Sequence, residues 1–264
     1  MKLWAIILVL VGSLLAACGA QGSSDEKQEV NVFAAASLQD VIKELGQMYQ
    51  QRTGAVPVYN FAGSNELARQ ILASSKADVF LTANEDWMNK VEEGGRVVTG
   101  TRTTLLSNRL TVVANNDSPY QLSNPADLAT LTYRQLVLAD PDAVPAGIYA
   151  KEWLSSQPNP GGAGTLWDTV SDRVVPALDV RAALALVESD PDLIGIVYRT
   201  DVVAADQVRI LYEVPETVEP KIVYAAAAIS GGPNTDGGRT FVDFLKTAEA
   251  SDVFRRYGFI PPPK

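Results

Sequence analysis

The stretch from Asn31 to Asp40 constrains the fold most, because it places a serine where a strand gives way to a helix. Val30 to Ala36 is a short apolar run, which predicts a buried strand. After Ser37, apolar residues recur at helical spacing: Leu38, Val41, Ile42 and Leu45. A helix is therefore expected to begin near Ser37, which makes this segment a βα unit.

The next 40 residues repeat this arrangement. Val56 to Phe61 is strand-like, Gly63-Ser64-Asn65 is a predicted turn, and an apolar helical pattern follows. Backbone N–H groups and the positive end of the helix dipole converge at such a junction, which suits an anion. Two serines in matching positions therefore indicate a shared oxyanion site, since ligands of open α/β sheets collect at the carboxyl ends of strands. For either serine alone, a plain helix cap is the commoner role, and this alternative stays open.

Strand-like and helix-like segments alternate along the rest of the chain, which predicts an α/β fold with mostly parallel sheets. Gly231-Gly232 and Gly237-Gly238 flank Pro-Asn-Thr-Asp and predict a hairpin or loop, and Gln157 to Thr165 predicts a surface loop. We expect strands near 30–34, 56–61, 78–82, 110–114, 135–139, 193–198, 208–213 and 223–229. We expect helices near 38–52, 65–74, 85–94, 147–156, 180–189, 239–248 and 250–257.

The N-terminus has the pattern of a targeting segment. Residues 1–17 combine a basic Lys2 with an apolar run too short to span a membrane comfortably, which predicts a signal peptide. Leu-Ala-Ala-Cys18 looks like a bacterial lipobox, in which the cysteine is lipidated and becomes the mature N-terminus. Residues 18–29 are then a lipidated cysteine and a flexible tether rich in Gly, Ser and charge.

Composition narrows the function further. The chain is 47% apolar, so it can bury a core, and its net charge of −9 argues against nucleic-acid binding. It has no histidine, and its one cysteine is Cys18. Histidine-based triads, histidine metal ligands and a cysteine nucleophile are therefore excluded. A Ser/Lys hydrolase remains conceivable, although no residue spacing supports one.

Several segments together resemble the periplasmic molybdate-binding proteins of ABC importers. They lie in order from about residue 30 to the C-terminus, so the resemblance covers essentially the whole mature chain. The most specific are Pro145-Ala-Gly-Ile-Tyr-Ala-Lys151 and the segment that begins Asp179-Val-Arg. The others are Val32-Phe-Ala-Ala-Ala-Ser37-Leu, Phe61-Ala-Gly-Ser64-Asn-Glu-Leu-Ala-Arg-Gln-Ile71, Ala77-Asp-Val-Phe, Gly195-Ile-Val-Tyr198 and Arg256-Tyr-Gly-Phe259.

The resemblance implies a two-lobed periplasmic-binding-protein fold of type II, with ligand in the cleft between the lobes. Lobe one would comprise residues 30–106 and 217–264, and lobe two residues 107–216. The segment 108–114 would leave lobe one, and 212–215 would begin the return.

The resemblance also implies a ligand site without catalytic residues. Ser37 and Ser64 match serines that donate hydroxyl and backbone hydrogen bonds to the oxyanion. Ala146 and Val180 match backbone N–H donors, and Tyr198 matches a phenol donor. Molybdenum would be bound only as the oxyanion through these five residues, with no cofactor. Of their side chains only Tyr198 titrates, near pH 10, so affinity is expected to vary less than about tenfold around neutral pH.

The function implied is that of a lipid-anchored extracytoplasmic protein, not an enzyme, that captures molybdate, and tungstate too. It would be a monomer that delivers its ligand to an ABC importer permease with its ATPase. Asn65 departs from the small hydroxyl residue that relatives commonly carry there, so a binder of another tetrahedral oxyanion such as sulfate is the alternative. An envelope Ser/Lys hydrolase and an adhesin-like protein are the alternatives from other classes.

Overall fold

The computed structural model describes residues 28–74, 76–203, 205–215 and 220–262. The predicted signal peptide and Cys18 lie outside these residues, as does the tether up to residue 27. Within the described part of the chain, no helix combines the length and apolar character needed to cross a bilayer.

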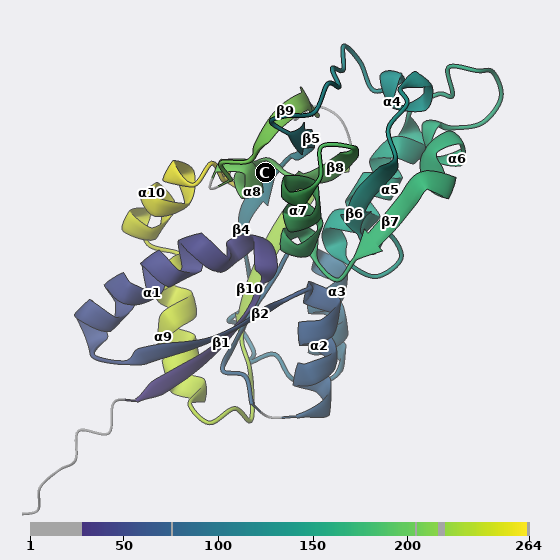
Figure 1. Cartoon of the computed structure of the whole chain (residues 1–264). Coiled ribbons are helices and arrows are strands. Elements are labelled where there is room, and N and C mark those ends of the chain that lie inside the picture. The colour runs from purple at the N-terminus through teal and green to yellow at the C-terminus, as the bar shows by residue number, and fades with distance from the viewer. Residues whose placement is uncertain (1–27, 75, 204, 216–219, 263–264) are drawn as a thin grey trace, which may run out of the picture.

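Two five-stranded sheets form the framework (Figure 1). In each sheet four strands run in one direction, and the second strand from one edge runs the opposite way. The first sheet has the order β2 (Val56–Ala62), β1 (Glu29–Ala35), β3 (Val79–Thr82), β10 (Ile222–Ala228) and β4 (Thr103–Asn108). The second has the order β7 (Val174–Ala177), β6 (Gln135–Ala139), β8 (Leu193–Tyr198), β5 (Leu110–Asn115) and β9 (Val208–Glu213). The mostly parallel α/β architecture predicted from the sequence is thus confirmed.

Helices cover both sheets. On the first sheet α9 contacts β1, β3 and β10, and α2 and α3 also contact its strands; on the second, α7 and α5 pack against β6 and β8. The central strands β3 and β8 are therefore buried along their whole length, as expected for parallel strands covered on both faces. The α-helices are α1 (Gln39–Thr53), α2 (Ser64–Ala73), α3 (Glu85–Glu93), α4 (Asp127–Thr130), α5 (Pro145–Ser156), α6 (Leu166–Val170), α7 (Val180–Ser189), α8 (Arg199–Val203), α9 (Thr235–Leu245) and α10 (Ala248–Arg256). The 3₁₀ turns are η1 (Ala36–Leu38) and η2 (Ser171–Arg173).

The chain passes between the sheets at two places. Only Arg109 separates the end of β4 in the first sheet from the start of β5 in the second. The return runs from the end of β9 at Glu213 to the start of β10 at Ile222. Each sheet and its helices therefore form one half of the molecule, with the C-terminal helices α9 and α10 on the half that contains β1.

The loop predicted between Gly231 and Gly238 is only partly a loop: residues 230–234 form turns, and α9 begins at Thr235. Gly237 and Gly238 lie in the first turn of α9, which is capped by Asn234, whose side chain accepts a hydrogen bond from the N–H of Gly237. Gly238 lies against the backbone carbonyl of Asp78, where any side chain would collide. Gly238 therefore allows α9 to approach the residue before β3 closely, which the local pattern does not reveal.

Two strands are absent from the sequence-based prediction. β4 is a polar segment, Thr-Thr-Leu-Leu-Ser-Asn, that is held by antiparallel pairing with β10. β7 is short and contains Pro176, and it lies at the edge of the second sheet, where a proline is tolerated. Both strands owe their conformation to a distant partner rather than to local propensity.

Candidate functional site

Ser37 lies in η1, between the end of β1 and the start of α1. Its hydroxyl makes no helix-capping hydrogen bond and instead lies 3.0 Å from the phenol oxygen of Tyr224, on β10. The plain helix cap, left open from the sequence, is therefore wrong for Ser37. Tertiary structure holds this side chain at the carboxyl end of β1.

Ser64 is the first residue of α2, directly after β2 and Gly63. Its hydroxyl oxygen accepts a hydrogen bond from the backbone N–H of Ala83 at 3.0 Å, and it does not cap its own helix. The helix-cap alternative is wrong here too. Because the N–H of Ala83 can only donate, the Ser64 hydroxyl proton is available to a further acceptor.

Ala146 lies in the first turn of α5, which begins at Pro145. Proline suits this first position because it has no N–H that would need an acceptor. The N–H of Ala146, one residue later, has no acceptor within the helix. Gly147 completes the turn, since a side chain there would collide with the carbonyl oxygens of Ala139 and Asp140 at the end of β6. The Pro-Ala-Gly segment thus sets the helix end closely on the strand end.

Val180 is the first residue of α7, and Asp179 is its N-cap. The Asp179 carboxylate accepts hydrogen bonds from the backbone N–H groups of Arg181 and Ala182, both at 2.9 Å. Because the cap occupies the next two amides, the N–H of Val180 is left for another acceptor.

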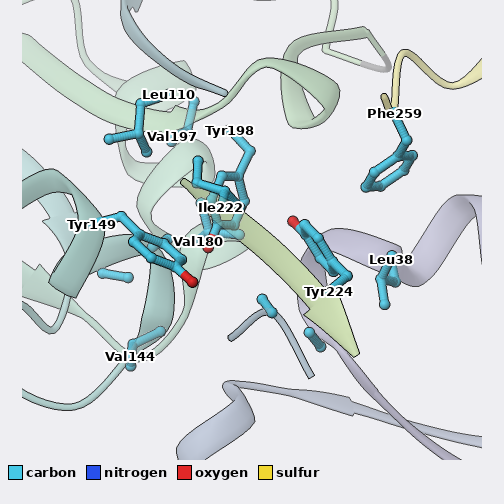
Figure 2. Packing of buried hydrophobic residues seen from close by; sticks show 14 of the residues in the cluster. Leu38, Leu110, Val144, Tyr149, Val180, Val197, Tyr198, Ile222, Tyr224 and Phe259 are labelled. Carbon is cyan, nitrogen blue, oxygen red and sulfur yellow. The ribbon is translucent and has the colours of Figure 1, made fainter. Parts of the chain in front are cut away.

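Tyr198 ends β8 and is fully buried. Among the described residues its phenol oxygen has no hydrogen-bond partner, although a buried hydroxyl normally has one. Figure 2 shows its ring beside that of Tyr224, with the two centroids 5.9 Å apart. Burial raises the pKa of Tyr198 well above 10, so the phenol stays protonated and can donate.

These five residues line one cavity between the two sheets. Ser37 and Ser64 come from the first half of the molecule, and Ala146, Val180 and Tyr198 from the second. Neither lysine nor arginine appears among the lining residues in the described part of the chain. The lining is Ala35, Ala36, Ser37, Ala62, Gly63, Ser64, Ala83, Val144, Pro145, Ala146, Asp179, Val180 and Tyr198.

The N-terminal ends of three helices, α2, α5 and α7, meet at this cavity. Their dipoles place partial positive charge there without any cationic side chain. Neutral and fixed donors of this kind hold a small anion by hydrogen bonds, and hydrogen bonds to a charged group are the strong ones. The arrangement can bind an oxyanion but has no nucleophile–base pair within it.

Contacts between the two halves lie beside the cavity. The indole N–H of Trp87, on α3, donates to the carbonyl oxygen of Ala143 at 3.1 Å. Arg181, on α7, forms an ion pair with Asp40, on α1, at 3.1 Å. The halves are thus in contact beside the cavity that both of them line.

Comparison with known proteins identifies the family. The sequence profile of the bacterial extracellular solute-binding proteins matches residues 30–260. The chain belongs to this family. A protein of Escherichia coli (strain K12) named molybdate-binding protein ModA is 37% identical over 255 residues, covering 95% of this chain and 96% of that protein. A Bacillus subtilis (strain 168) protein named a putative ABC transporter substrate-binding lipoprotein is 32% identical, covering 93% of each chain.

Solved structures agree on the two-lobed periplasmic-binding-protein fold. The periplasmic molybdate-binding protein of Azotobacter vinelandii superposes with a TM-score of 0.76 at 21% identity, covering 89% of this chain and all of that one. The sulfate-binding protein of Mycobacterium tuberculosis superposes with a TM-score of 0.73 at 16% identity, covering 89% and 87%. The predicted family and fold are confirmed, and solute-binding proteins of this family are not enzymes, as expected.

Three polar residues near the cavity of this solute-binding protein were not recognised from its sequence. Asp201 is buried, and one of its oxygens accepts a hydrogen bond from the N–H of Tyr198 at 3.2 Å. Burial raises the pKa of Asp201 to about 7, although Arg181 and that N–H act in the opposite direction. Tyr224 and Asn108 form a buried hydrogen-bonded pair beside Ser37. Tyr224 and Asn108 act through contacts more than 100 residues apart in sequence, and Asp201 is marked by its burial rather than by a local motif.

Other charged and polar residues lie around the cavity without lining it. Arg69 pairs with Glu66 one helical turn away, and Arg181 pairs with Asp40 and Asp201, so both arginines make structural ion pairs. Asn65 is buried beside Gly63 but does not line the cavity. No group of three or more His, Cys, Asp or Glu side chains that could hold a metal ion occurs in residues 28–74, 76–203, 205–215 and 220–262.

Proposed function

We propose that this solute-binding protein captures molybdate outside the cytoplasm and delivers it to an ABC importer permease with its ATPase. Donor positions from both halves converge on one cavity without a cationic side chain, and this geometry supports the proposal. The name of the Escherichia coli relative, at 37% identity over nearly the whole of both chains, supports molybdate as the ligand.

The donor set suits a fully deprotonated tetrahedral dianion. Ser37, Ser64 and Tyr198 supply hydroxyl groups, and Ala146 and Val180 supply backbone N–H groups. Tungstate has the same charge and shape as molybdate and is proposed as a second ligand. Sulfate is smaller than molybdate, so the size of the cavity determines which of these two anions binds more tightly.

The binding assay is a calorimetric titration of molybdate, tungstate, sulfate and phosphate. We expect Ser37→Ala and Ser64→Ala each to weaken molybdate binding by at least about tenfold, because each removes a hydrogen bond to a charged group. Ser189→Ala is a matched control, since among the described residues the Ser189 hydroxyl donates only to the carbonyl oxygen of Leu186 in its own helix. If sulfate binds more tightly than molybdate, sulfate is the ligand in place of molybdate. Hydrolysis of a bound ester would contradict a binding role.

We propose that residues 30–106 with 217–264 and residues 107–216 form two lobes that open and close around the anion. Donors from both lobes favour the closed state once ligand is bound, because only that state makes all the contacts. A monomer is sufficient for this function, since one chain supplies all five residues.

Anchoring by a lipid on Cys18 completes the proposal, and the Bacillus subtilis relative is itself named a lipoprotein. We expect the mature wild-type protein to begin at a lipidated Cys18 and Cys18→Ser to remain unprocessed and unlipidated. Intact-mass spectrometry of membrane fractions measures this. A wild-type protein that begins at another residue without lipid would contradict the anchor and leave the binding function untouched.

A further inference from the structure

Behind Ser37, the side chains of Tyr224, Asn108 and Thr200 form a buried chain of hydrogen bonds, here called the relay. Asn108 ends β4, immediately before the chain crosses to the second sheet, and Tyr224 lies on the neighbouring strand β10. The Asn108 side-chain nitrogen donates to the Tyr224 phenol oxygen at 3.2 Å and to the Thr200 hydroxyl oxygen at 2.9 Å. All these side chains are buried.

The directions of these hydrogen bonds follow from donor and acceptor chemistry. The N–H of Arg109 can only donate, and it lies 2.9 Å from the side-chain oxygen of Asn108. The other atom of that amide must then be the nitrogen, which has two protons. One proton goes to Thr200 and the other to Tyr224, so the phenol oxygen of Tyr224 accepts.

The phenol proton of Tyr224 then has one available acceptor among the described residues. Among the described partners of this oxygen, only the Ser37 hydroxyl oxygen, 3.0 Å away, can accept it. With its oxygen accepting from Tyr224, Ser37 has its own proton left for the cavity that it lines. Ser64 reaches the same state by accepting from the N–H of Ala83.

We infer that Tyr224 and Asn108 are positioning residues that make Ser37 a hydrogen-bond donor to the bound oxyanion. The inference rests on the proposed function. Without Tyr224 the Ser37 hydroxyl could rotate toward other acceptors, and part of its interaction with the anion would be lost. Thr200 belongs to the second half, so the relay also joins both halves where the chain crosses.

The test is a double-mutant cycle on molybdate affinity, measured by calorimetry. Tyr224→Phe is expected to weaken binding about fivefold to tenfold in the wild type, the effect of one hydrogen bond. In a Ser37→Ala background the same change is expected to alter affinity less than about twofold, because the group through which Tyr224 acts is gone. An equal loss in both backgrounds, or no loss in the wild type, would overturn the relay.

Tyr133→Phe is the matched control. Tyr133 is also buried, and its phenol donates to the carbonyl oxygen of Leu128 at 3.0 Å, away from the cavity. It should lower stability and leave molybdate affinity unchanged. A shift in affinity as large as that of Tyr224→Phe would mean that loss of any buried phenol weakens binding, and would overturn the specific role of Tyr224.

A measurement on the ligand-free protein tests the relay independently of the proposed molybdate binding. Neutron diffraction from wild-type crystals in deuterated solvent should place the Tyr224 deuteron between the phenol oxygen and the Ser37 oxygen. A deuteron on Ser37 that points at Tyr224 would overturn the relay, even if molybdate binds. Failure of the wild type to bind molybdate would contradict the proposed function, and the deuteron position would still decide the relay.

Discussion

Replacing Tyr198 with phenylalanine is expected to weaken molybdate binding about 10- to 150-fold without destabilising the ligand-free protein. A hydrogen bond to a charged group contributes about 1.5–3 kcal/mol, which sets the loss of affinity. The phenol oxygen of Tyr198 is buried and has no partner among the described residues, so the fold gains no protein hydrogen bond from it. The ligand-free variant should therefore unfold at the same temperature as the wild type or at a higher one.

Calorimetric titration and thermal unfolding of the ligand-free protein measure the two effects of Tyr198→Phe. Tyr133→Phe again serves as the control, because its buried phenol has a protein acceptor in Leu128. The control should lose stability and keep its affinity, the reverse of the Tyr198 variant. A Tyr198 variant that loses stability with unchanged affinity would assign its hydroxyl to the fold and remove it from the site.

The stability of the protein is expected to fall between about pH 4 and pH 7 through Asp201. Burial raises the pKa of this carboxyl group in the folded protein to about 7, whereas an unfolded aspartate has a pKa of about 3.9. Between these values the folded state binds one more proton than the unfolded state, so stability decreases as pH rises. Three pKa units at about 1.4 kcal/mol each give a loss of up to about 4 kcal/mol, complete above about pH 7.

Asp201→Asn removes the titrating group while keeping an oxygen that can accept from the N–H of Tyr198. We expect the free energy of unfolding of this variant, relative to the wild type, to rise as the pH is raised from 4.5 to 8. Chemical denaturation at several pH values measures the difference. Asp172→Asn removes one negative charge from an exposed position and serves as the control. A difference independent of pH would contradict a raised pKa for Asp201.

The Asp201 carboxyl group is also expected to affect ligand binding. The five proposed donors predict a molybdate affinity that is nearly independent of pH, since Tyr198 alone among them titrates. Asp201 adds a carboxyl group hydrogen-bonded to the N–H of Tyr198, where a bound anion would favour its protonated form. Proton uptake on molybdate binding near pH 7 would then be lost in Asp201→Asn, which calorimetry in buffers of different ionisation heat can measure.

Local sequence determined much of this protein. Apolar runs and helical spacing predicted both βα units, because burial of one face fixes the periodicity of each element. The position of Pro145 and the cap at Asp179 follow from short-range chemistry at helix starts, which requires no tertiary contact. Ser37 and Ser64 stand out at strand ends for the same reason. Ala146 and Val180 came only from the family resemblance, since a backbone donor carries no side-chain signal.

Only the tertiary structure decided what these residues contact. The sequence alone left a helix cap as the commoner role of each serine, yet Ser37 contacts Tyr224, 187 residues away, and Ser64 accepts from Ala83. Asp201, Asn108 and Tyr224 gained their importance through burial and through neighbours from other elements. Hydrogen-bond direction and the pKa of a buried group depend on every surrounding atom, and those atoms come from segments that only folding brings together.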